Sequence, residues 1–190
     1  MKAELMILGV LHRGNFHPYE IKRRLANAMV ECYTEVDVGT LYYAVRRLAG
    51  DGLISPVSRE KVARGGMRTV YGITARGRRR FQELLCEQFE AEGPVAQTLY
   101  GAMLFLHLAD LPAIAARLRR KIIQQTEAIR EVSVLRKRLA PVLSTGGRHL
   151  MAHLSLQRRL DRKWLQAVLA DVEAGNVRDV PDARRLAAQE

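Results

Sequence analysis

The sequence predicts a mainly α-helical fold: an N-terminal winged helix-turn-helix with a two-stranded β-hairpin wing, followed by a C-terminal α-helical dimerisation domain. Residues 39–50 carry apolar side chains at helical spacing, and two short β-rich runs follow around a glycine pair. A threonine then precedes another helical pattern, which completes the order of elements of a winged helix. Beyond residue 93, two long helical patterns are separated by Pro141 and Gly146-Gly147.

The first two helices are predicted from apolar periodicity and stop signals. The first covers about residues 2–13 and ends at Gly14-Asn15. The second covers about residues 18–29 and opens on Pro18, a residue well suited to the first helical turn. Residues 31–37 then form the turn that leads into the third helix.

The third helix, residues 39–50, has two different faces. Its apolar face is formed by side chains at helical spacing: Leu41, Ala44, Val45 and Leu48. At about 100° per residue, Tyr43, Arg46 and Arg47 fall on the opposite face. Asp37 stands where an N-cap is expected, and Gly52 ends the helix. One face therefore packs inside the domain, and the other offers an aromatic ring and two guanidinium groups.

Two strands, residues 53–58 and 69–73, form the predicted wing. Pro56 marks the first as an edge strand, because proline cannot donate a hydrogen bond to a neighbouring strand. Gly65-Gly66 allows the positive φ angles of a tight hairpin turn. Thr74 is the predicted N-cap of the fourth helix. The wing also carries a cluster of cations: Arg59, Lys61, Arg64 and Arg68.

The balance of charge favours a polyanionic partner. The chain of 190 residues has a formal net charge of +11, and residues 38–82 hold ten Lys/Arg against two Asp/Glu. A basic helical face alone is usually just a solvated face, but this order of helix, basic hairpin and capped helix favours binding to double-stranded DNA. Base edges in the major groove are expected to contact Thr40, Tyr43 and Arg46. The DNA backbone or the minor groove is expected to contact Lys22, Arg47, Lys61, Arg64 and Arg68.

Residues across the first half of the chain also match the pattern of a known family. They are Gly39-Thr40-Leu41-Tyr42, Leu48, Gly52-Leu53-Ile54, Tyr71-Gly72-Ile73-Thr74 and Gly77, with His17-Pro18-Tyr19-Glu20-Ile21 upstream. On these residues, about 3–90, the sequence resembles the PadR family of bacterial transcriptional regulators. Pro18 and Asp37-Val38 depart from the family's usual residues. The resemblance implies a DNA-binding regulator and adds Tyr42 to the expected DNA contacts.

Three regions follow from composition and breaks in the pattern. Residues 1–92 are the predicted winged-helix DNA-binding domain, and Gly93-Pro94 marks its end. Residues 93–175 form a helical domain for dimerisation and possible effector binding, with one short helix at 95–108 and two long helices. Residues 176–190 are polar and are expected to form a flexible tail.

The two long helices predict a homodimer. Apolar residues on the first recur at coiled-coil spacing, and the second, from about His149 to Ala174, has a broad apolar side. A second copy is the simplest cover for both faces, and the alternative is an intramolecular bundle with the fourth helix. Within the resemblance, PadR-like regulators dimerise through their C-terminal helices. The predicted dimer contacts are Leu118, Ile122, Ile129, Leu160 and Val168.

A small-molecule effector is a further expectation. PadR-like regulators often respond to small molecules, including phenolic compounds, near the dimer interface, so the resemblance implies a small aromatic effector. Trp164, the only tryptophan, is the candidate wall of such a site, although it also fits an ordinary core position.

Other classes of function find little support in the sequence. We expect a cytoplasmic protein, because the chain has neither an apolar run long enough for a membrane span nor a recognisable signal peptide. We also expect no cofactor and no metal. No nucleophile elbow, phosphate loop or dinucleotide fingerprint points to an enzyme. Cys32 and Cys86 allow a redox pair only if they lie close together, and His149 and His153, four residues apart, lack further metal ligands nearby.

The main alternative function keeps the fold and changes the partner. Winged helices also serve as protein-interaction modules, and a basic surface can bind anionic membranes. The basic residues on both the third helix and the wing favour an operator of inverted-repeat sequence, bound by the two subunits of a dimer.

Overall fold

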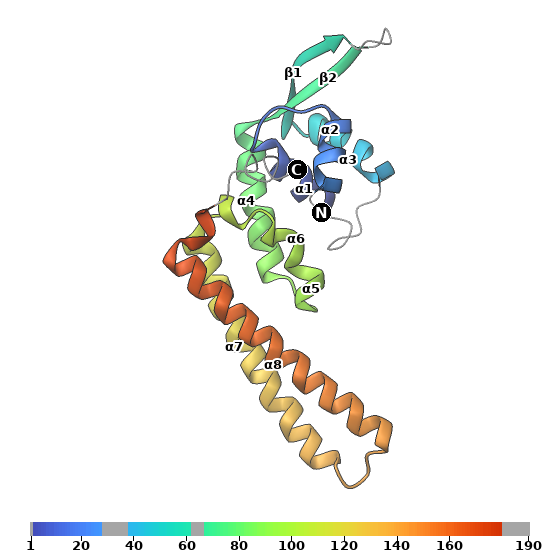
Figure 1. Ribbon diagram of the computed structural model, residues 1–190, viewed down its shortest axis with the longest axis vertical. Coiled ribbons are helices and arrows are strands. Elements are labelled where there is room, and N and C mark those ends of the chain that lie inside the picture. The colour runs from blue at the N-terminus through green and yellow to red at the C-terminus, as the bar shows by residue number, and fades with distance from the viewer. Residues whose placement is uncertain (1, 28–37, 62–66, 180–190) are drawn as a thin grey trace, which may run out of the picture. The chain divides into compact units, whose positions relative to one another are not determined.

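The computed structural model describes residues 2–27, 38–61 and 67–179, and the chain forms two compact units. The first is Met1–Ala109 and the second is Asp110–Glu190 (Figure 1). The observed fold is mainly helical with one two-stranded antiparallel sheet, as the sequence predicts.

The first unit is built around helix α1 (Lys2–Leu11), which packs on α2 (Pro18–Asn27), α3 (Val38–Gly50) and α4 (Ala75–Glu90). Residues 4–11 of α1 are all buried, and the apolar face predicted for α3 is buried as well. Burial of this kind stabilises a short helix far more than its own propensity does. The helices therefore hold α3 by its apolar face and leave its other face outward.

The wing consists of strands β1 (Ile54–Lys61) and β2 (Met67–Ile73), which form an antiparallel hairpin that extends beyond α1–α4 (Figure 1). Both strands reach further toward the hairpin turn than the sequence pattern indicates. Phe16 pairs with Tyr71 through backbone hydrogen bonds, which ties the base of the wing to the segment before α2. The predicted turn at Gly65-Gly66 lies outside the described residues, as does the predicted cap Asp37.

The junction between the wing and α4 follows the predicted chemistry. Gly52 has φ = 68°, the left-handed conformation expected where α3 ends. The hydroxyl of Thr74 donates to the carbonyl oxygens of Gly52 at 2.9 Å and Leu53 at 3.0 Å, and accepts from the amide of Gly77 at 3.0 Å. Thr74 therefore caps α4 and fixes its start against the chain that enters β1.

The segment predicted as one short helix, residues 95–108, is broken into three pieces. These are α5 (Val95–Thr98), α6 (Tyr100–Met103) and the 3-10 turn η2 (Leu106–Leu108). Its apolar residues lie on several sides of the chain, and α6 packs on both α1 and α4, so one straight helix would leave part of them uncovered. The first compact unit consequently runs to Ala109, beyond the boundary predicted at Gly93-Pro94.

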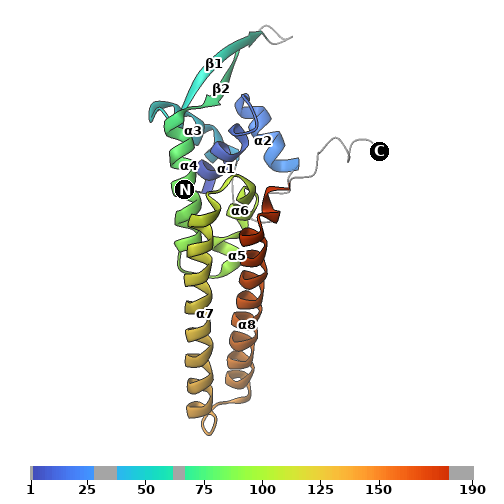
Figure 2. The ribbon, with the colours of Figure 1, turned by 90° about the vertical axis from the view of Figure 1, so that its left-hand side faces the viewer.

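The second unit is an antiparallel helical hairpin of α7 (Leu111–Leu139) and α8 (Thr145–Ala174), which lie side by side along their length (Figure 2). Asp110 caps α7, because its Oδ1 accepts a hydrogen bond from the amide of Ala113 at 3.2 Å. Ser144 caps α8 by accepting from the amide of Gly147 at 3.1 Å. The Gly146-Gly147 pair thus lies in the first turn of α8 rather than before it, because a serine cap satisfies the free amides there.

The end of α8 is set by Gly175, whose φ of 77° terminates the helix, and a short turn η3 (Asn176–Arg178) follows. Residues 180–190 of the predicted tail lie outside the described residues. Among the helices that the structure describes, none is both long enough and apolar enough to cross a lipid bilayer.

Candidate nucleic-acid interface

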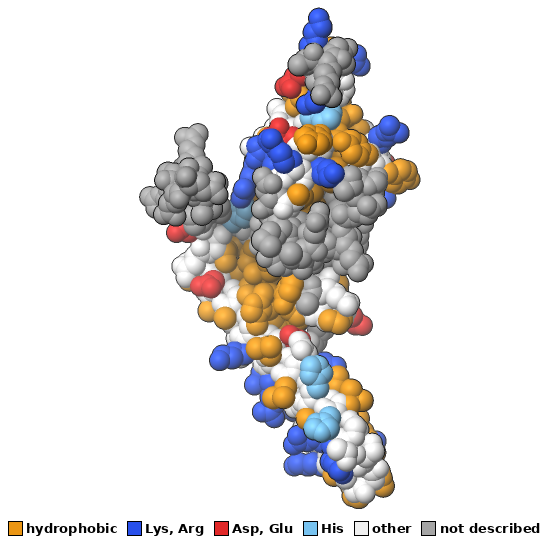
Figure 3. Space-filling model, turned by 45° about the vertical axis from the view of Figure 1, so that its right-hand side comes forward, with side chains coloured by type: hydrophobic (Ala, Val, Ile, Leu, Met, Phe, Trp, Pro, Cys, Tyr) orange, Lys and Arg blue, Asp and Glu red, His pale blue; other side chains and the backbone are white. Residues whose placement is uncertain are grey.

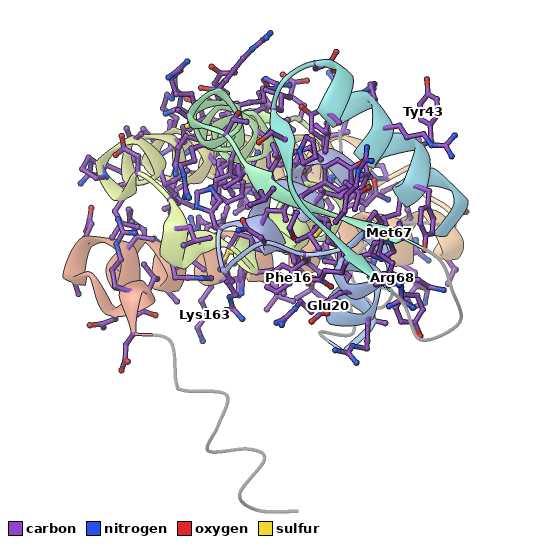
Figure 4. The ribbon with its side chains drawn as sticks, turned by 90° about the horizontal axis from the view of Figure 1, so that it is seen from above. Phe16, Glu20, Tyr43, Met67, Arg68 and Lys163 are labelled. Carbon is purple, nitrogen blue, oxygen red and sulfur yellow. The ribbon has the colours of Figure 1, made fainter. Side chains whose placement is uncertain are left out.

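The outward face of α3 is the strongest candidate surface. Tyr43 is 69% exposed and Tyr42 is 41% exposed, and Arg46 lies on the same helix with its side chain in solvent. Figure 4 shows Tyr43 projecting outward from α3. Two tyrosines and a guanidinium exposed on one helical face offer rings, hydroxyls and hydrogen-bond donors to a partner. Thr40 belongs to α3, but its side chain lies outside the described residues.

Arg47, also on the predicted recognition face, has an intramolecular partner. Its Nη2 donates to Oε2 of Glu4 on α1 at 3.2 Å. The Nε of Arg80 on α4 donates to the other oxygen, Oε1 of Glu4, also at 3.2 Å. Glu4 is 7% exposed, so one buried carboxylate joins α1, α3 and α4.

Arg80 is itself held by two more carboxylates of α4. Its Nη1 donates to Glu87 at 2.7 Å and to Glu83 at 3.2 Å. The hydrogen bond to Glu87 is the largest cause that raises the pKa of Arg80, and Glu83 and Glu4 act in the same direction. Arg80 therefore keeps its positive charge at every physiological pH and links α4 to the carboxylate of Glu4 on α1.

The wing presents its charged side chains on two opposite faces. Lys61 pairs with Met67 in the strand register, and Glu60 pairs with Arg68. Because successive residues of a strand point to opposite sides, Lys61 and Met67 share one face while Glu60 and Arg68 share the other. Lys61 and Arg68, which are both predicted DNA contacts of the wing, therefore lie on opposite faces of the sheet. Arg64 lies outside the described residues.

A small groove lies between the Arg68 face of the wing and the start of α2. Its volume is about 170 Å³, and its lining includes Phe16, Glu20 and Arg68, which are labelled in Figure 4. Two carboxylates and two guanidinium groups face each other there: Glu20, Glu60, Arg23 and Arg68. Because the charges compensate, the groove alone indicates no particular ligand.

His17 shapes the entrance of this groove. Its Nδ1 accepts a hydrogen bond from the backbone amide of Tyr19 at 3.1 Å, so the ring caps α2 and is neutral in this geometry. Burial lowers the pKa of His17, the nearby guanidinium of Arg68 lowers it further, and Glu60 opposes the shift. Protonation would remove the acceptor that caps the helix.

The predicted contact Lys22 lies half-buried on α2, beside a more exposed pair of arginines. Glu20 accepts from Arg24 at 3.1 Å and from Arg23 at 3.4 Å. Arg24 also stacks over the ring of Phe16 at 4.0 Å from its centroid. Lys22 has no such ion pair among the described residues, so its charge is available to an anion outside the protein.

The predicted dimer contacts fall into two groups. A single chain already buries Leu118, Ile129 and Val168, and Ile122 is half-buried. Leu160 is 63% exposed on α8, and other apolar residues of the same hairpin are exposed with it: Ile123, Val134, Leu150, Leu154 and Leu156. Figure 3 shows hydrophobic side chains interspersed with Lys and Arg along this hairpin. Apolar side chains of both α7 and α8 therefore remain exposed in a single chain, and the predicted contact Leu160 is one of them.

Trp164, the candidate effector contact, is half-buried on α8. The same hairpin buries Nε of Arg162 and Oε1 of Gln125, neither of which has a hydrogen-bond partner among the described residues. The two cysteines of the redox alternative are not both described: Cys86 is half-buried on α4, and Cys32 lies outside the described residues.

Sequence reasoning missed Glu4 and His17. An acid in the first turn of a helix usually interacts with the helix dipole, and nothing local indicates that Glu4 instead meets Arg47 and Arg80, which lie 43 and 76 residues away. The one available signal was an acid inside an otherwise apolar helix, since a buried charge requires partners.

Comparisons with known proteins find one family model and several solved structures that are similar to this chain. Residues 7–83 match the model of the transcriptional regulator PadR-like family. Similar solved structures include Bacillus subtilis PadR in complex with operator DNA (14% identity, 89% of this chain and 98% of that one, TM-score 0.41). They also include the same protein with p-coumaric acid (14%, 91% and 99%, TM-score 0.38) and smu.1604c from Streptococcus mutans (22%, 90% and 99%, TM-score 0.43).

No curated protein gives a significant match. The family match covers α1 from Ile7 onward, α2, α3, the wing and the first half of α4, the same elements that carry the exposed face of α3 and its support. Members of this family are transcriptional regulators rather than enzymes. Over residues 7–83, the chain is similar to the transcriptional regulator PadR-like family.

Proposed function

We propose that the protein is a homodimeric, sequence-specific DNA-binding repressor that acts in the cytoplasm on an inverted-repeat operator. The observation that carries the proposal is the outward face of α3, where Tyr42, Tyr43 and Arg46 are exposed opposite a fully buried apolar face. A helix held in this way, beside a hairpin wing, is suited to enter the major groove of B-DNA.

The proposed contacts divide by chemistry. Arg46 can form two hydrogen bonds to guanine, and Tyr43 offers a ring and a hydroxyl to neighbouring base edges. Backbone phosphates are assigned to Lys22 and Lys61, whose charges have no ion-pair partner among the described residues. Thr40, Tyr42, Arg64 and Arg68 complete the proposed surface, with Arg68 reaching DNA from the groove-facing side of the wing.

Dimerisation is supported by the exposed apolar residues of α8. Leu156 and Leu160 lie one helical turn apart, both more than half exposed, on a helix whose other side packs on α7. Such a surface fits a second copy of the same chain, since a two-fold dimer presents two α3 helices to the two halves of an inverted repeat. Half-sites about one helical turn of DNA apart are then expected.

Binding of duplex DNA is tested by affinity measurements on the DNA upstream of the gene, a scrambled duplex and anionic lipid vesicles. We expect tighter binding to the upstream DNA and a steep loss of affinity with salt, because each phosphate contact releases counterions. Equal affinity for the two duplexes, or binding to vesicles alone, would favour the alternative of a winged-helix module that has no operator of its own.

Control by a small aromatic effector is the least direct part of the proposal. Its support is the half-buried Trp164 on a hairpin that also buries the unpartnered polar atoms of Gln125 and Arg162. A planar aromatic acid should change the fluorescence of Trp164 saturably and weaken operator binding over the same concentration range. A fluorescence change without loss of DNA affinity would assign Trp164 to packing alone.

A further inference from the structure

We propose that Glu4 is a positioning residue for DNA recognition: its buried carboxylate fixes α3 through Arg47 and withholds the charge of Arg47 from the DNA backbone. The inference rests on the proposed function, because it concerns the helix assigned to the major groove. It also changes the role of Arg47, which the sequence pattern alone assigns to a phosphate.

The geometry at Glu4 leaves neither carboxylate oxygen without a cation. Arg47 donates to Oε2 and Arg80 donates to Oε1, both at 3.2 Å. An isolated carboxylate at this depth in α1 would be costly, so each arginine offsets the cost of burying the charge. Removal of either partner therefore disturbs the other, and the three side chains act as one link between α1, α3 and α4.

Arg46 and Arg47 are neighbours on α3 but differ in their surroundings. The side chain of Arg47 is 48% exposed, but its guanidinium is paired with Glu4. Arg46 is exposed and has no ion pair among the described residues. The unpaired guanidinium is free to reach a base, whereas the paired one holds the helix at a defined rotation about its axis.

The link also sets α3 relative to the wing. Arg80 is paired with Glu83 and Glu87 on α4, and Thr74, the N-cap of α4, directly follows β2. The two elements proposed to face DNA, α3 and the wing, are thus both attached to α4. A small rotation of α3 would move Tyr43 and Arg46 away from base edges without displacing the wing, and recognition would lose specificity before it lost affinity.

The test compares Glu4→Gln with Glu83→Gln on operator and scrambled duplexes at several salt concentrations. Glu83→Gln is the matched control, because it removes the same charge from the Arg80 cluster without touching Arg47. Glu4→Gln should lower the operator-to-scrambled affinity ratio about tenfold and steepen the salt slope by about one unit, since Arg47 is released toward phosphate. Glu83→Gln should change neither quantity.

Arg47→Gln supplies a second variant that keeps the inference testable if Glu4→Gln does not fold. It should reduce the affinity ratio and leave the salt slope unchanged, because no phosphate contact is lost. A slope that flattens by about one unit in Arg47→Gln would show Arg47 on the backbone and overturn the inference, as would an unchanged affinity ratio in both variants.

Hydrogen exchange distinguishes failure of the proposed Glu4 link from failure of the proposed function. A parent protein that binds no duplex contradicts the function itself, and the link is then judged on the free protein. Glu4→Gln or Arg47→Gln should speed exchange of the α3 amides about tenfold while the amides of α7 and α8 stay unchanged. Exchange of α3 at the parent's rate would overturn the link.

Discussion

The amide of Gly77 donates a 3.0 Å hydrogen bond to the hydroxyl oxygen of Thr74, and the same hydroxyl donates to the carbonyl of Leu53. One side chain therefore caps α4 and anchors the start of the wing. We expect Thr74→Ala to lower the free energy of unfolding by about 0.5–2 kcal/mol, the range for loss of an N-cap. Urea unfolding would measure it, with Ser58→Ala, at an exposed position of β1, as the control.

Gly77 should tolerate even less change. A Cβ at this position would collide with the carbonyl oxygen of Leu53, which belongs to the backbone and cannot move aside. Gly77→Ala should therefore destabilise the first unit by about 1–3 kcal/mol, in the range of other overpacking substitutions. Gly50→Ala is the matched control, because a Cβ there meets nothing within 4 Å and should leave stability unchanged or slightly raised.

The structure around Thr74 also shows what local sequence patterns can predict. The cap at Thr74, the left-handed Gly52 and the buried face of α3 each depend on residues close together in the chain, and the structure confirms all three. The predicted start of α8 was too late because a serine cap one turn earlier outweighed the two glycines at 146 and 147.

Contacts between distant residues were beyond such patterns. The Glu4 cluster joins three helices, and its members share no spacing that marks them as partners. The heptad pattern of α7 also identified apolar residues correctly without showing which of them the chain would cover by itself. Leu118 and Ile129 of α7 are buried in a single copy, whereas Ile123 of the same helix is 58% exposed.

Stability of the first unit should depend on pH through His12. Its ring packs at a tilt against Phe81 with centroids 4.5 Å apart, and its Nδ1 lies 3.2 Å from the guanidinium of Arg78. Burial lowers the pKa of His12, and Arg78 and then His107 lower it further. The folded state thus binds fewer protons than the unfolded one, so this contribution is complete above about pH 6.5 and is lost as the pH falls through the lowered pKa.

His12→Gln should therefore lose part of the decline in thermal stability seen between neutral pH and about pH 5. His153→Gln, at an exposed position of α8, is the control and should follow the parent. The decline that remains in His12→Gln is expected from His17, whose pKa is lowered in the same direction. An unchanged pH profile in His12→Gln would show that the ring titrates as it does in the unfolded chain.

Assembly should depend on the exposed leucines of α8. Leu160→Asp would place a charge in the proposed interface without disturbing the buried side of the helix, so sedimentation should show dissociation of a folded dimer. Val142→Asp, in the loop between α7 and α8, is the control for an added charge at an exposed apolar residue. Ile122→Asp is less informative, because Ile122 is half-buried and its loss would also affect folding of the chain.

Specific recognition should depend on Arg46. Arg46→Ala removes the exposed guanidinium assigned to guanine, worth about 1–3 kcal/mol of discrimination, and should weaken operator binding more than binding to a scrambled duplex. Arg138→Ala removes the same charge from an exposed position on α7 and should reduce neither affinity appreciably. Lys61→Ala, by contrast, should weaken both duplexes evenly and flatten the salt slope by about one unit, because a phosphate contact carries little sequence information. An equal loss on both duplexes in Arg46→Ala would place this guanidinium on the backbone, and base reading would then fall to Tyr43 and Thr40.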